Sequence, residues 1–346
     1  MIEYTNLGSD YRISRVINGG WQLSEGHHSS KIADPVEAML PLFESGINAF
    51  DCADIYTGVE ELIGEIRTVY KKKYGSWPGV KVHTKFVPDY DQLKTINKDY
   101  VERIIDRSLK RLKQERLDMV QFAWWTYDIP GWVETAQWLE EIRKAGKIDL
   151  LSLTNFNTER TRGFIDAGLN ISTHQVQYSL LDRRPEKSMS AMCEEHEIQL
   201  LCYGTIAGGF LSEKWLGQSE PKQDYPNRSL IKYKLIIDDF GGWDLFQHLL
   251  QTLQKIAVRH DSSIANVATR YILNQPQVAA VIIGAKNSSH LEDNLRLFEL
   301  KLDQSDNSQI NQVLALANPI EGDVFDIERI MDGAHGRIMK YNLNDS

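Results

Sequence analysis

A strand followed by a helix is encoded in the stretch Asn48-Ala49-Phe50-Asp51-Cys52-Ala53-Asp54-Ile55-Tyr56 and in the segment of helical period at 58–70. A short apolar run followed by a longer amphipathic segment is typical of the βα unit of a parallel sheet. The same alternation recurs on both sides of this stretch, from about residue 14 onward. The number of such units therefore decides the architecture.

Eight apolar runs predict strands at 16–21, 49–51, 80–86, 119–124, 150–154, 174–178, 200–203 and 281–283. Segments of helical period follow them at 35–45, 58–70, 98–112, 131–145, 158–167, 185–197, 243–260 and 288–298. Gly46, Gly146 and Gly168 stand where C-terminal helix caps are needed, since glycine adopts the left-handed conformation without steric cost. Eight strands, each followed by a helix, predict an α/β fold that closes into a (β/α)8 TIM barrel, and an open doubly wound sheet is the less favoured alternative.

The length of 346 residues fits a single barrel domain over 1–346. Two segments fall outside the repeat. Residues 207–242 are predicted to form a long irregular loop over the cofactor or substrate, because they follow the seventh strand on the face where barrel enzymes build their sites. Residues 301–346 are predicted to form an additional helix, at about 305–316, and a tail without clear period.

The composition, with 42% hydrophobic and 25% charged residues, is that of an ordinary globular protein. A net charge of -9 disfavours nucleic acid as a partner, because phosphate binding needs a clustered positive surface. No window approaches about 18 uninterrupted apolar residues and the start lacks a leader pattern, so we expect a cytoplasmic protein without a membrane segment. Cys52, Cys193 and Cys202 are odd in number and lack metal-ligand spacing, so we expect neither a disulfide framework nor a metal site.

Polar residues near the ends of the predicted strands indicate a site, because a barrel presents the C-terminal ends of its strands at one mouth. Asp51 ends the second strand, Tyr56 follows it, and Lys85 lies near the end of the third. Each residue alone has an ordinary structural explanation. Together they predict a proton-donating group, because a nearby ammonium favours phenolate and would lower the pKa of the tyrosine.

The sequence resembles the aldo-keto reductase family from about residue 7 to about residue 300. Residues 48–56 are similar to the family's strand-two signature, in which an aspartate precedes the proton-donor tyrosine, and residues 60–64 and 83–85 fit the helix and the lysine that follow. Further similarity to cofactor-holding segments of the family lies at 151–156, 175–179 and 283–286, with Asp293-Asn294. The resemblance implies a barrel enzyme that reduces an aldehyde or ketone with a hydride from a nicotinamide cofactor.

The resemblance also implies roles for individual residues. Tyr56 would donate the proton, tuned by Lys85 and Asp51, while Asn155 and Gln175 would bind the carboxamide. Tyr178 would stack on the nicotinamide ring. The glycine-containing loop at 203–211 would follow the pyrophosphate, and a lysine, a serine and a histidine at 286–290 would meet a 2′-phosphate, which favours NADP(H) over NAD. The expected cofactor-binding residues are Gly20, Trp21, Thr154, Asn155, Gln175, Tyr178, Tyr203, Gly204, Thr205, Ala207, Gly209, Leu211, Ile283, Gly284, Lys286, Ser288, His290, Asp293 and Asn294.

The chain departs from the family pattern at strand four. The family places a histidine before a tryptophan there, and aligning residues 117–125 puts Ala123 at that position. Loss of one hydrogen-bond donor from a preorganised site lowers the rate by about 100-fold to 1,000-fold. An engineered change, a shift to another substrate or reaction, and a protein that keeps the cofactor with little turnover all explain it. His83 and Tyr127 are candidate substitutes, although a structural role is favoured for both.

Aromatic side chains at or beyond the strand ends predict a substrate pocket for an apolar or planar carbonyl compound. The expected pocket residues are Trp21, Phe86, Trp124, Trp125 and Tyr127. Trp124 and Trp125 are adjacent, so both cannot face inward on a strand.

Two alternatives to a reductase stay open. One is a cofactor-binding sensor or regulatory protein, which Ala123 supports, and the other is a non-redox lyase with Tyr56 and Lys85 as its acid-base pair.

Overall fold

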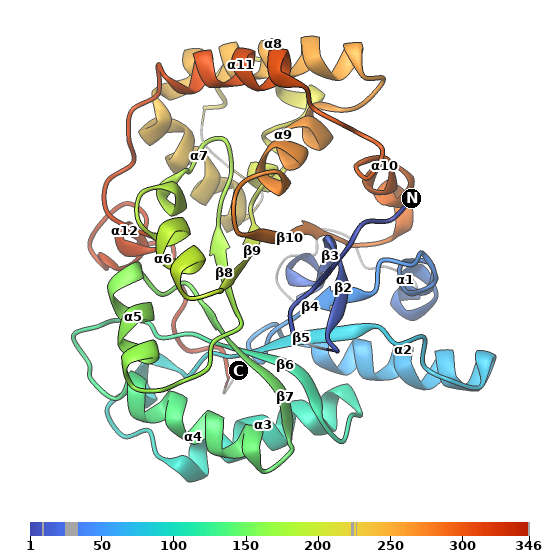
Figure 1. The fold of residues 1–346 in the computed structure, drawn as a ribbon, viewed down its shortest axis with the longest axis vertical. Coiled ribbons are helices and arrows are strands. Elements are labelled where there is room, and N and C mark those ends of the chain that lie inside the picture. Colours follow the sequence, from blue (N-terminus) through green and yellow to red (C-terminus); the bar gives the residue numbers. More distant parts are fainter. Residues whose placement is uncertain (9, 25–33, 223–224, 226, 345–346) are drawn as a thin grey trace.

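Eight parallel strands close into a barrel in the computed structural model, which describes residues 1–8, 10–24, 34–222, 225 and 227–344 (Figure 1). The strands pair in sequence order, and the last returns to the first, so no edge is left open and the (β/α)8 TIM barrel is confirmed. All eight predicted strands are present. They are β3 (Val16–Gly19), β4 (Ala49–Asp51), β5 (Lys81–Phe86), β6 (Leu117–Phe122), β7 (Ile148–Thr154), β8 (Thr173–Gln177), β9 (Gln199–Tyr203) and β10 (Val278–Gly284).

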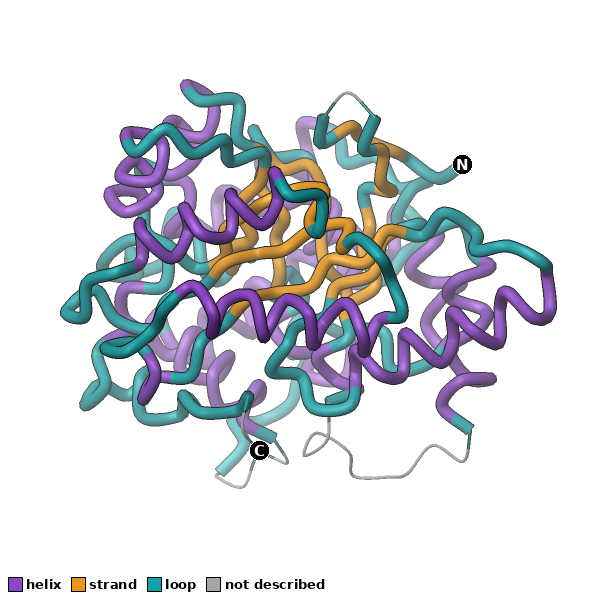
Figure 2. Tube along the Cα trace, turned by 90° about the horizontal axis from the view of Figure 1, so that it is seen from below, coloured by secondary structure: helices purple, strands orange, loops and turns teal. Residues whose placement is uncertain are grey.

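Helices surround the strands on the outside of the barrel (Figure 2). Several begin at a side chain that accepts a hydrogen bond from a free N–H group of the first turn, as Asp34, Asn97 and Asn157 do. Gly46, Gly146 and Gly168 all have positive φ, as predicted for residues at helix ends. The helices at predicted positions are α1 (Pro35–Glu44), α2 (Val59–Tyr74), α3 (Lys98–Leu112), α4 (Trp132–Lys144), α5 (Thr158–Asp166), α6 (Met189–Glu195), α8 (Gly242–Arg259), α10 (Leu291–Arg296) and α11 (Gln304–Leu314).

Three helices lie where the sequence pattern predicts none: α7 (Arg228–Phe240), α9 (Ile264–Leu273) and α12 (Asp326–Arg329). The expectation of an irregular loop throughout 207–242 is therefore wrong in its second half. There α7 begins at the capping side chain of Asn227 and buries an apolar face against the rest of the protein. Residues 223–224 and 226 of this segment, and 345–346 of the tail, lie outside the described residues. The short 3-10 helices are η1 (Trp21–Leu23), η2 (Tyr90–Gln92), η3 (Arg184–Glu186), η4 (Ala207–Gly209), η5 (Glu213–Trp215) and η6 (Ser288–His290).

An antiparallel hairpin, β1 (Tyr4–Asn6) with β2 (Arg12–Ser14), precedes the barrel. Its apolar residues, among them Tyr11, pack against interior residues of several barrel strands. The ammonium of Lys81, the first residue of β5, lies 4.6 Å from the centre of the Tyr11 ring. The hairpin therefore covers the end of the barrel where the strands begin and leaves the opposite end for a site.

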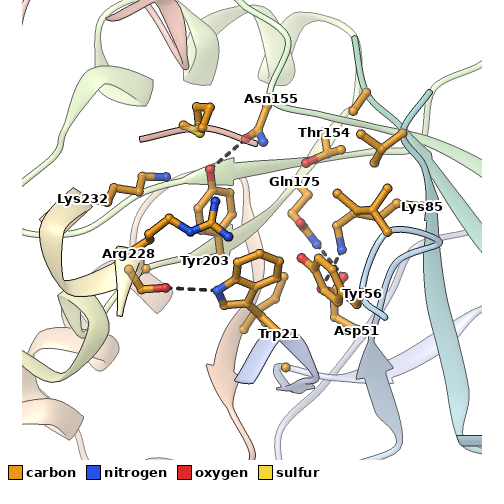
Figure 3. A pocket seen from close by; sticks show the side chains of 18 of the residues that line it. Trp21, Asp51, Tyr56, Lys85, Thr154, Asn155, Gln175, Tyr203, Arg228 and Lys232 are labelled. Atoms are coloured by element: carbon orange, nitrogen blue, oxygen red, sulfur yellow. Dashed lines mark hydrogen bonds and ion pairs between the residues drawn. The ribbon is translucent and has the colours of Figure 1, made fainter. Parts of the chain in front are cut away.

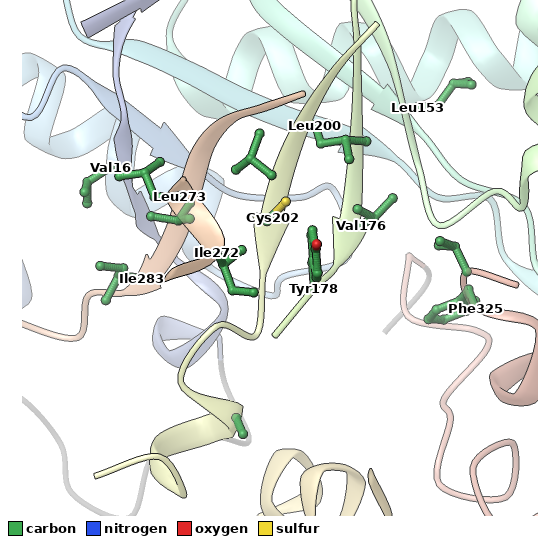
Figure 4. Close-up of a cluster of buried hydrophobic side chains, with 14 of the residues drawn as sticks. Val16, Leu153, Val176, Tyr178, Leu200, Cys202, Ile272, Leu273, Ile283 and Phe325 are labelled. Atoms are coloured by element: carbon green, nitrogen blue, oxygen red, sulfur yellow. The ribbon is translucent and has the colours of Figure 1, made fainter. Parts of the chain in front are cut away.

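The core consists of apolar side chains between the strands and the helices that surround them (Figure 4). Cys52, Cys193 and Cys202 belong to it as buried free thiols, and burial raises the pKa of each, that of Cys193 to about 12. Across the described ranges, no helix combines the length and the apolar character that a membrane crossing requires.

Candidate active site

A cavity of about 310 Å³ lies at the C-terminal ends of the barrel strands, bounded by α7 and by the C-terminal tail (Figure 3). It brings together the expected acid, lysine and tyrosine and fewer than half of the expected binding residues. Those that line it are Trp21, Asp51, Tyr56, Lys85, Trp124, Trp125, Thr154, Asn155, Gln175, Tyr203, Gly204 and Gly284.

Asp51 and Lys85 form a buried ion pair at the base of the cavity, with 2.7 Å between Lys85 Nζ and Asp51 Oδ2. The ammonium also donates to the carbonyl oxygen of Cys52 at 2.9 Å. The other carboxylate oxygen accepts from Gln121 Nε2 at 2.8 Å and from Gln175 Nε2 at 2.6 Å. A buried ion pair is tolerated when further hydrogen bonds satisfy both partners, and this one meets that condition.

Tyr56 stands beside this pair, with its ring centre 5.2 Å from Lys85 Nζ and 4.7 Å from the ring of Trp21. Burial raises the pKa of Tyr56 well above its ordinary value, and the negative charge of Asp51 adds to the rise. The net shift is therefore opposite to the one expected from the lysine, because desolvation and the carboxylate act in the opposite direction. The phenol consequently keeps its proton at neutral pH.

The polar wall next to Tyr56 is complementary to a primary amide. Asn155 Oδ1 accepts from the hydroxyl of Tyr203 at 2.9 Å, and its Nδ2 makes no hydrogen bond to any described residue. Gln175 uses its Nε2 on Asp51, which leaves Oε1 as an acceptor. A free amide donor and a free amide acceptor at the same cavity fit the carboxamide of a nicotinamide, which presents one acceptor and one donor.

Three of the expected tyrosine, phenylalanine and tryptophan side chains lie outside the cavity. Tyr178 is buried among core residues such as Val176 and Cys202 (Figure 4), and its hydroxyl donates to Glu186 at 2.9 Å. The expectation that it stacks on a nicotinamide ring is wrong, because successive residues of a strand point to opposite faces and Gln175 and Gln177 take the interior one. Tyr203 lines the cavity instead.

Phe86 and Tyr127 are the other two corrections. Phe86 follows Lys85 on β5, so its ring points outward and packs against Tyr100 and Phe122. Tyr127 is used in packing, since its ring stacks on Phe156 and its hydroxyl accepts the N–H of Asn157 at 3.0 Å. Neither side chain lines the cavity.

The segment after β9 passes along the cavity with glycines where a side chain would collide. Gly204 and Gly208 have φ of +79° and +63°, and a Cβ atom on either would come within 2.8 Å of Tyr233. Alternate residues of the segment line the cavity, namely Gly204, Ile206 and Gly208. The remaining expected residues here do not line it: Thr205, Ala207 and Leu211 are buried, and Gly209 is half-buried.

The turn after β10 lies beyond the cavity, except for Gly284, which lines it. Lys286 and Ser288 are half-buried and His290 is exposed, so all three are accessible to a ligand that extends out of the cavity. Asp293 is used structurally, because its carboxylate accepts from Asn266 and Ser263 and so joins α10 to α9. Three further expected residues, Gly20, Ile283 and Asn294, are buried and do not line the cavity.

Ala123 directly follows β6 and lines the cavity. The neighbouring indole groups do not replace a histidine donor, because Trp124 Nε1 donates to the carbonyl of Ile129 and Trp125 Nε1 to that of Pro88. His83 is fully buried inside the barrel, where burial lowers its pKa to about 4. Neither His83 nor Tyr127 lines the cavity, so neither supplies the missing donor.

Several cavity residues were missed by sequence reasoning. Gln121 does not line the cavity but donates to Asp51 at its base, and its place two residues before Ala123 on β6 gives it the parity of an interior residue. The side chains of α7 and of the tail carried no such signal, because only tertiary contacts bring them to the mouth. For α7, one such contact is the hydrogen bond from Trp21 Nε1 to Ser229 Oγ at 3.0 Å. Outside the predicted loop at 203–211, the missed lining residues are Arg228, Ser229, Lys232 and Tyr233 from α7, Phe325, Ile338, Met339, Lys340 and Leu343 from the tail, and Gly19, Gln22, Ile55, Val87 and Ile282 at or near the strand ends.

Residues 15–315 match the sequence profile of the aldo/keto reductase family. The chain belongs to this family. Members of the aldo/keto reductase family are oxidoreductases that use nicotinamide cofactors and act on small carbonyl compounds.

Among relatives of this aldo/keto reductase, YhdN of Bacillus subtilis (strain 168) is 26% identical over 331 residues, covering 92% of this chain and 96% of the relative. An NADH-specific methylglyoxal reductase of Escherichia coli (strain K12) is 22% identical over 321 residues, covering 86% of this chain and 94% of the relative. The solved structure of the glycerol dehydrogenase AKR11B4 from Gluconobacter oxydans superposes with a TM-score of 0.73 at 23% identity, covering 93% of this chain and 97% of the other. These similarities extend over the whole barrel.

Proposed function

We propose that this aldo/keto reductase is an NADPH-dependent oxidoreductase that reduces an aldehyde or ketone with Tyr56 as proton donor. The observation that carries the proposal is the convergence of Tyr56 with the Asp51–Lys85 pair at the base of one cavity, beside an amide-complementary wall. The aromatic lining, with Trp21, Trp124 and Trp125, favours an apolar or aromatic substrate.

The residues of the cavity divide the chemistry between them. The phenol of Tyr56, protonated at neutral pH, would donate its proton to the carbonyl oxygen of the substrate. The ammonium of Lys85, fixed by Asp51, favours the phenolate that remains after the transfer. Asn155 and Gln175 would hold the carboxamide, and the ring of Tyr203 offers a flat face for stacking. When bound there, the nicotinamide ring supplies the hydride.

Ala123 sets the expected rate. With no second donor to the carbonyl oxygen, we expect reduction about 100-fold to 1,000-fold slower than with a histidine at this position. The deciding experiment compares single-turnover reduction of 4-nitrobenzaldehyde by NADPH in the wild-type chain and in Ala123→His, with Ala123→Leu as a size control. A gain of that order in the histidine variant alone supports the proposal, and loss of wild-type turnover in Tyr56→Phe confirms the donor.

A second candidate is a protein that binds the cofactor without efficient turnover. The observation that favours it is the satisfied state of both indole N–H groups next to Ala123, which leaves the reacting oxygen with Tyr56 as its donor. In the same experiment this candidate predicts tight NADPH binding and no gain with histidine. The lyase alternative finds no additional support in the cavity.

A further inference from the structure

Arg329, on the C-terminal helix α12, connects the ends of two strands that border the cavity. Its Nη2 donates to the backbone carbonyl of Asn155 at 2.7 Å and to that of Trp124 at 3.1 Å. Asn155 follows β7 and Trp124 follows β6. One guanidinium therefore joins Asn155, the expected carboxamide-binding residue, to Trp124, the neighbour of Ala123. These contacts span 205 and 174 positions of the sequence.

The guanidinium is itself held from several sides. It lies 4.2 Å from the ring centre of Tyr127 and 5.1 Å from that of Phe325, and its Nη1 donates to the carbonyl of Phe325 at 3.1 Å. Both aromatic faces attract a cation. Tyr127, which does not line the cavity, therefore packs its ring against the guanidinium of Arg329.

The helix that carries Arg329 is anchored by two of its acidic residues, both of which precede Arg329. Asp326 Oδ1 accepts from Asn157 Nδ2 at 3.0 Å. Glu328 receives two hydrogen bonds of 2.8 Å from the buried guanidinium of Arg184. Paired, charge-assisted contacts of this kind fix orientation as well as position. The guanidinium of Arg329 is therefore presented to the strand ends in a defined place.

Asn155 needs this support. Its φ of +61° lies in the left-handed region, which residues other than glycine adopt only where the surroundings impose it. Two further hydrogen bonds hold Asn155 in this conformation. Its N–H donates to the carbonyl of Gln175 at 3.0 Å, and its Oδ1 accepts from the hydroxyl of Tyr203. The carbonyl is the remaining group, and Arg329 takes it.

We propose that Arg329 is a positioning residue for nicotinamide binding, which acts by holding Asn155 in the conformation that presents its Nδ2 to the carboxamide. The inference rests on the proposed function, because it assumes that Asn155 meets a nicotinamide. It assigns to the C-terminal tail a part in cofactor binding in addition to forming a wall of the cavity.

A purely structural role for Arg329, as an anchor of the tail, makes a different prediction. An anchor affects all ligands of the site alike, whereas a positioning residue for Asn155 affects only ligands that carry a carboxamide. The test therefore compares dissociation constants for NADPH and for 2′-phospho-ADP-ribose, which keeps the phosphates and lacks the nicotinamide. The pair NADH and ADP-ribose, measured in parallel, removes any dependence on phosphate preference.

The variants are Arg329→Met, Arg329→Lys and, as a control for charge, Arg337→Met, which removes an exposed arginine from the same tail. In Arg329→Met we expect the preference for the nicotinamide-bearing ligand to fall by about 3-fold to 10-fold, the range for a lost hydrogen bond between the neutral amides of Asn155 and the carboxamide. Arg329→Lys keeps the charge without the planar fork, and we expect a smaller fall. Arg337→Met should leave the preference unchanged.

The preference is a ratio within each variant, so partial unfolding cancels from it, and Arg329→Lys carries the test if the methionine variant does not fold. Equal losses for both ligands, or no change in either, would overturn the inference. Failure of the proposed function is visible separately: the wild-type chain would then bind the nicotinamide-bearing ligand no better than its truncated analogue.

Discussion

At the scale of single residues, Asp51 organises the base of the site. It accepts hydrogen bonds from Lys85, Gln121 and Gln175, which come from three other strands of the barrel. A carboxylate only accepts, so each amide must turn its nitrogen toward Asp51 and its oxygen away. The charge on one residue thereby sets which atom Gln175 offers to a ligand, and the polarity of the binding wall follows from it.

Lys286 provides a test of cofactor preference. Because Lys286 is half-buried and follows Gly284, which lines the cavity, by two residues, we expect it to contact the 2′-phosphate that distinguishes NADPH from NADH. Lys286→Met should weaken NADPH binding by about tenfold or more and leave NADH binding nearly unchanged. Fluorescence titration measures both, with Lys301→Met as a control for loss of one exposed positive charge. Equal losses for the two cofactors would contradict this assignment.

At the scale of elements, strand β5 carries two interior residues with opposite electrostatic requirements. Lys85 is charged and paired with Asp51, whereas His83, two residues earlier, is fully buried, and burial lowers its pKa to about 4. The strand therefore places a charge at the mouth of the barrel and a neutral imidazole deeper inside. The buried imidazole should give the free energy of unfolding a measurable dependence on pH.

His83 should make the protein sensitive to acid. The unfolded chain binds a proton at this position below a pKa of about 6.5, while the folded chain does so only near pH 4. Its contribution is therefore complete above about pH 6.5 and is lost as the pH falls toward 4. Between pH 7 and 4.5, urea unfolding should show wild type losing about 2 kcal/mol relative to His83→Gln. The exposed His248, replaced in the same way, should show no such difference.

The glycine segment after β9 gives a prediction for a loop element. Gly204→Ala would put a Cβ atom 2.6 Å from the hydroxyl oxygen of Tyr233 on α7, in addition to the strain at φ +79°. Gly79→Ala meets similar strain at φ +76° with no atom within 4 Å, and is the matched control. The free energy of unfolding of the Gly204 variant should be about 1–3 kcal/mol lower than that of the control, and the variant should bind NADPH more weakly. Equal effects would show that α7 does not press on this segment.

The elements of the barrel are predictable from sequence to the extent that local pattern determines them. The strands are short apolar runs, and Asp51, Tyr56 and Lys85 lie at or near their ends, so period and order were enough. Tyr178 shows the limit of local pattern: it ends the predicted strand 174–178, but its parity is opposite to that of Gln175, so its ring lies in the core. Tyr203 occupies the cavity because its strand position has the inward parity.

The position of α7 and the contacts of Arg329 could not be predicted, because they depend on contacts between distant parts of the chain. Helix α7 follows a stretch rich in proline and glycine, which hid its start, and its place over the cavity depends on tertiary contacts such as that between Trp21 and Ser229. Arg329 reaches carbonyls in strand ends that no pattern in the tail announces. Backbone acceptors carry no sequence signal, so such contacts are visible only in the folded structure.

At the scale of the whole molecule, a buried charge cluster ties the tail to the barrel. Arg184 in η3 pairs with Asp182 at 2.7 Å and with Glu328 in α12 at 2.8 Å, and all three side chains are almost fully buried. Gln177, the last residue of β8, donates to Asp182 at 2.6 Å. The connection runs from the barrel strand to the wall of the cavity, so stability and site geometry share the same contacts.

Arg184→Met should therefore be costly, because it leaves two buried carboxylates without their cation. Removal of one partner from a buried ion pair typically lowers the free energy of unfolding by about 3–5 kcal/mol. Arg183→Met, which removes a partly exposed neighbour paired with Glu186, should cost less than about 1 kcal/mol. Urea unfolding measures both, and limited proteolysis should cut the tail of the Arg184 variant first. Similar costs for the two variants would exclude the cluster as an anchor.

The three buried cysteines give the folded protein an additional property. Because Cys52, Cys193 and Cys202 are all inaccessible thiols with raised pKa, a thiol reagent should modify the native protein only as fast as the chain opens around each one. They lie after β4, in α6 and in β9, on different parts of the ring. Their separate modification rates would therefore report how fast the barrel opens locally at three points of its circumference, without any engineered cysteine.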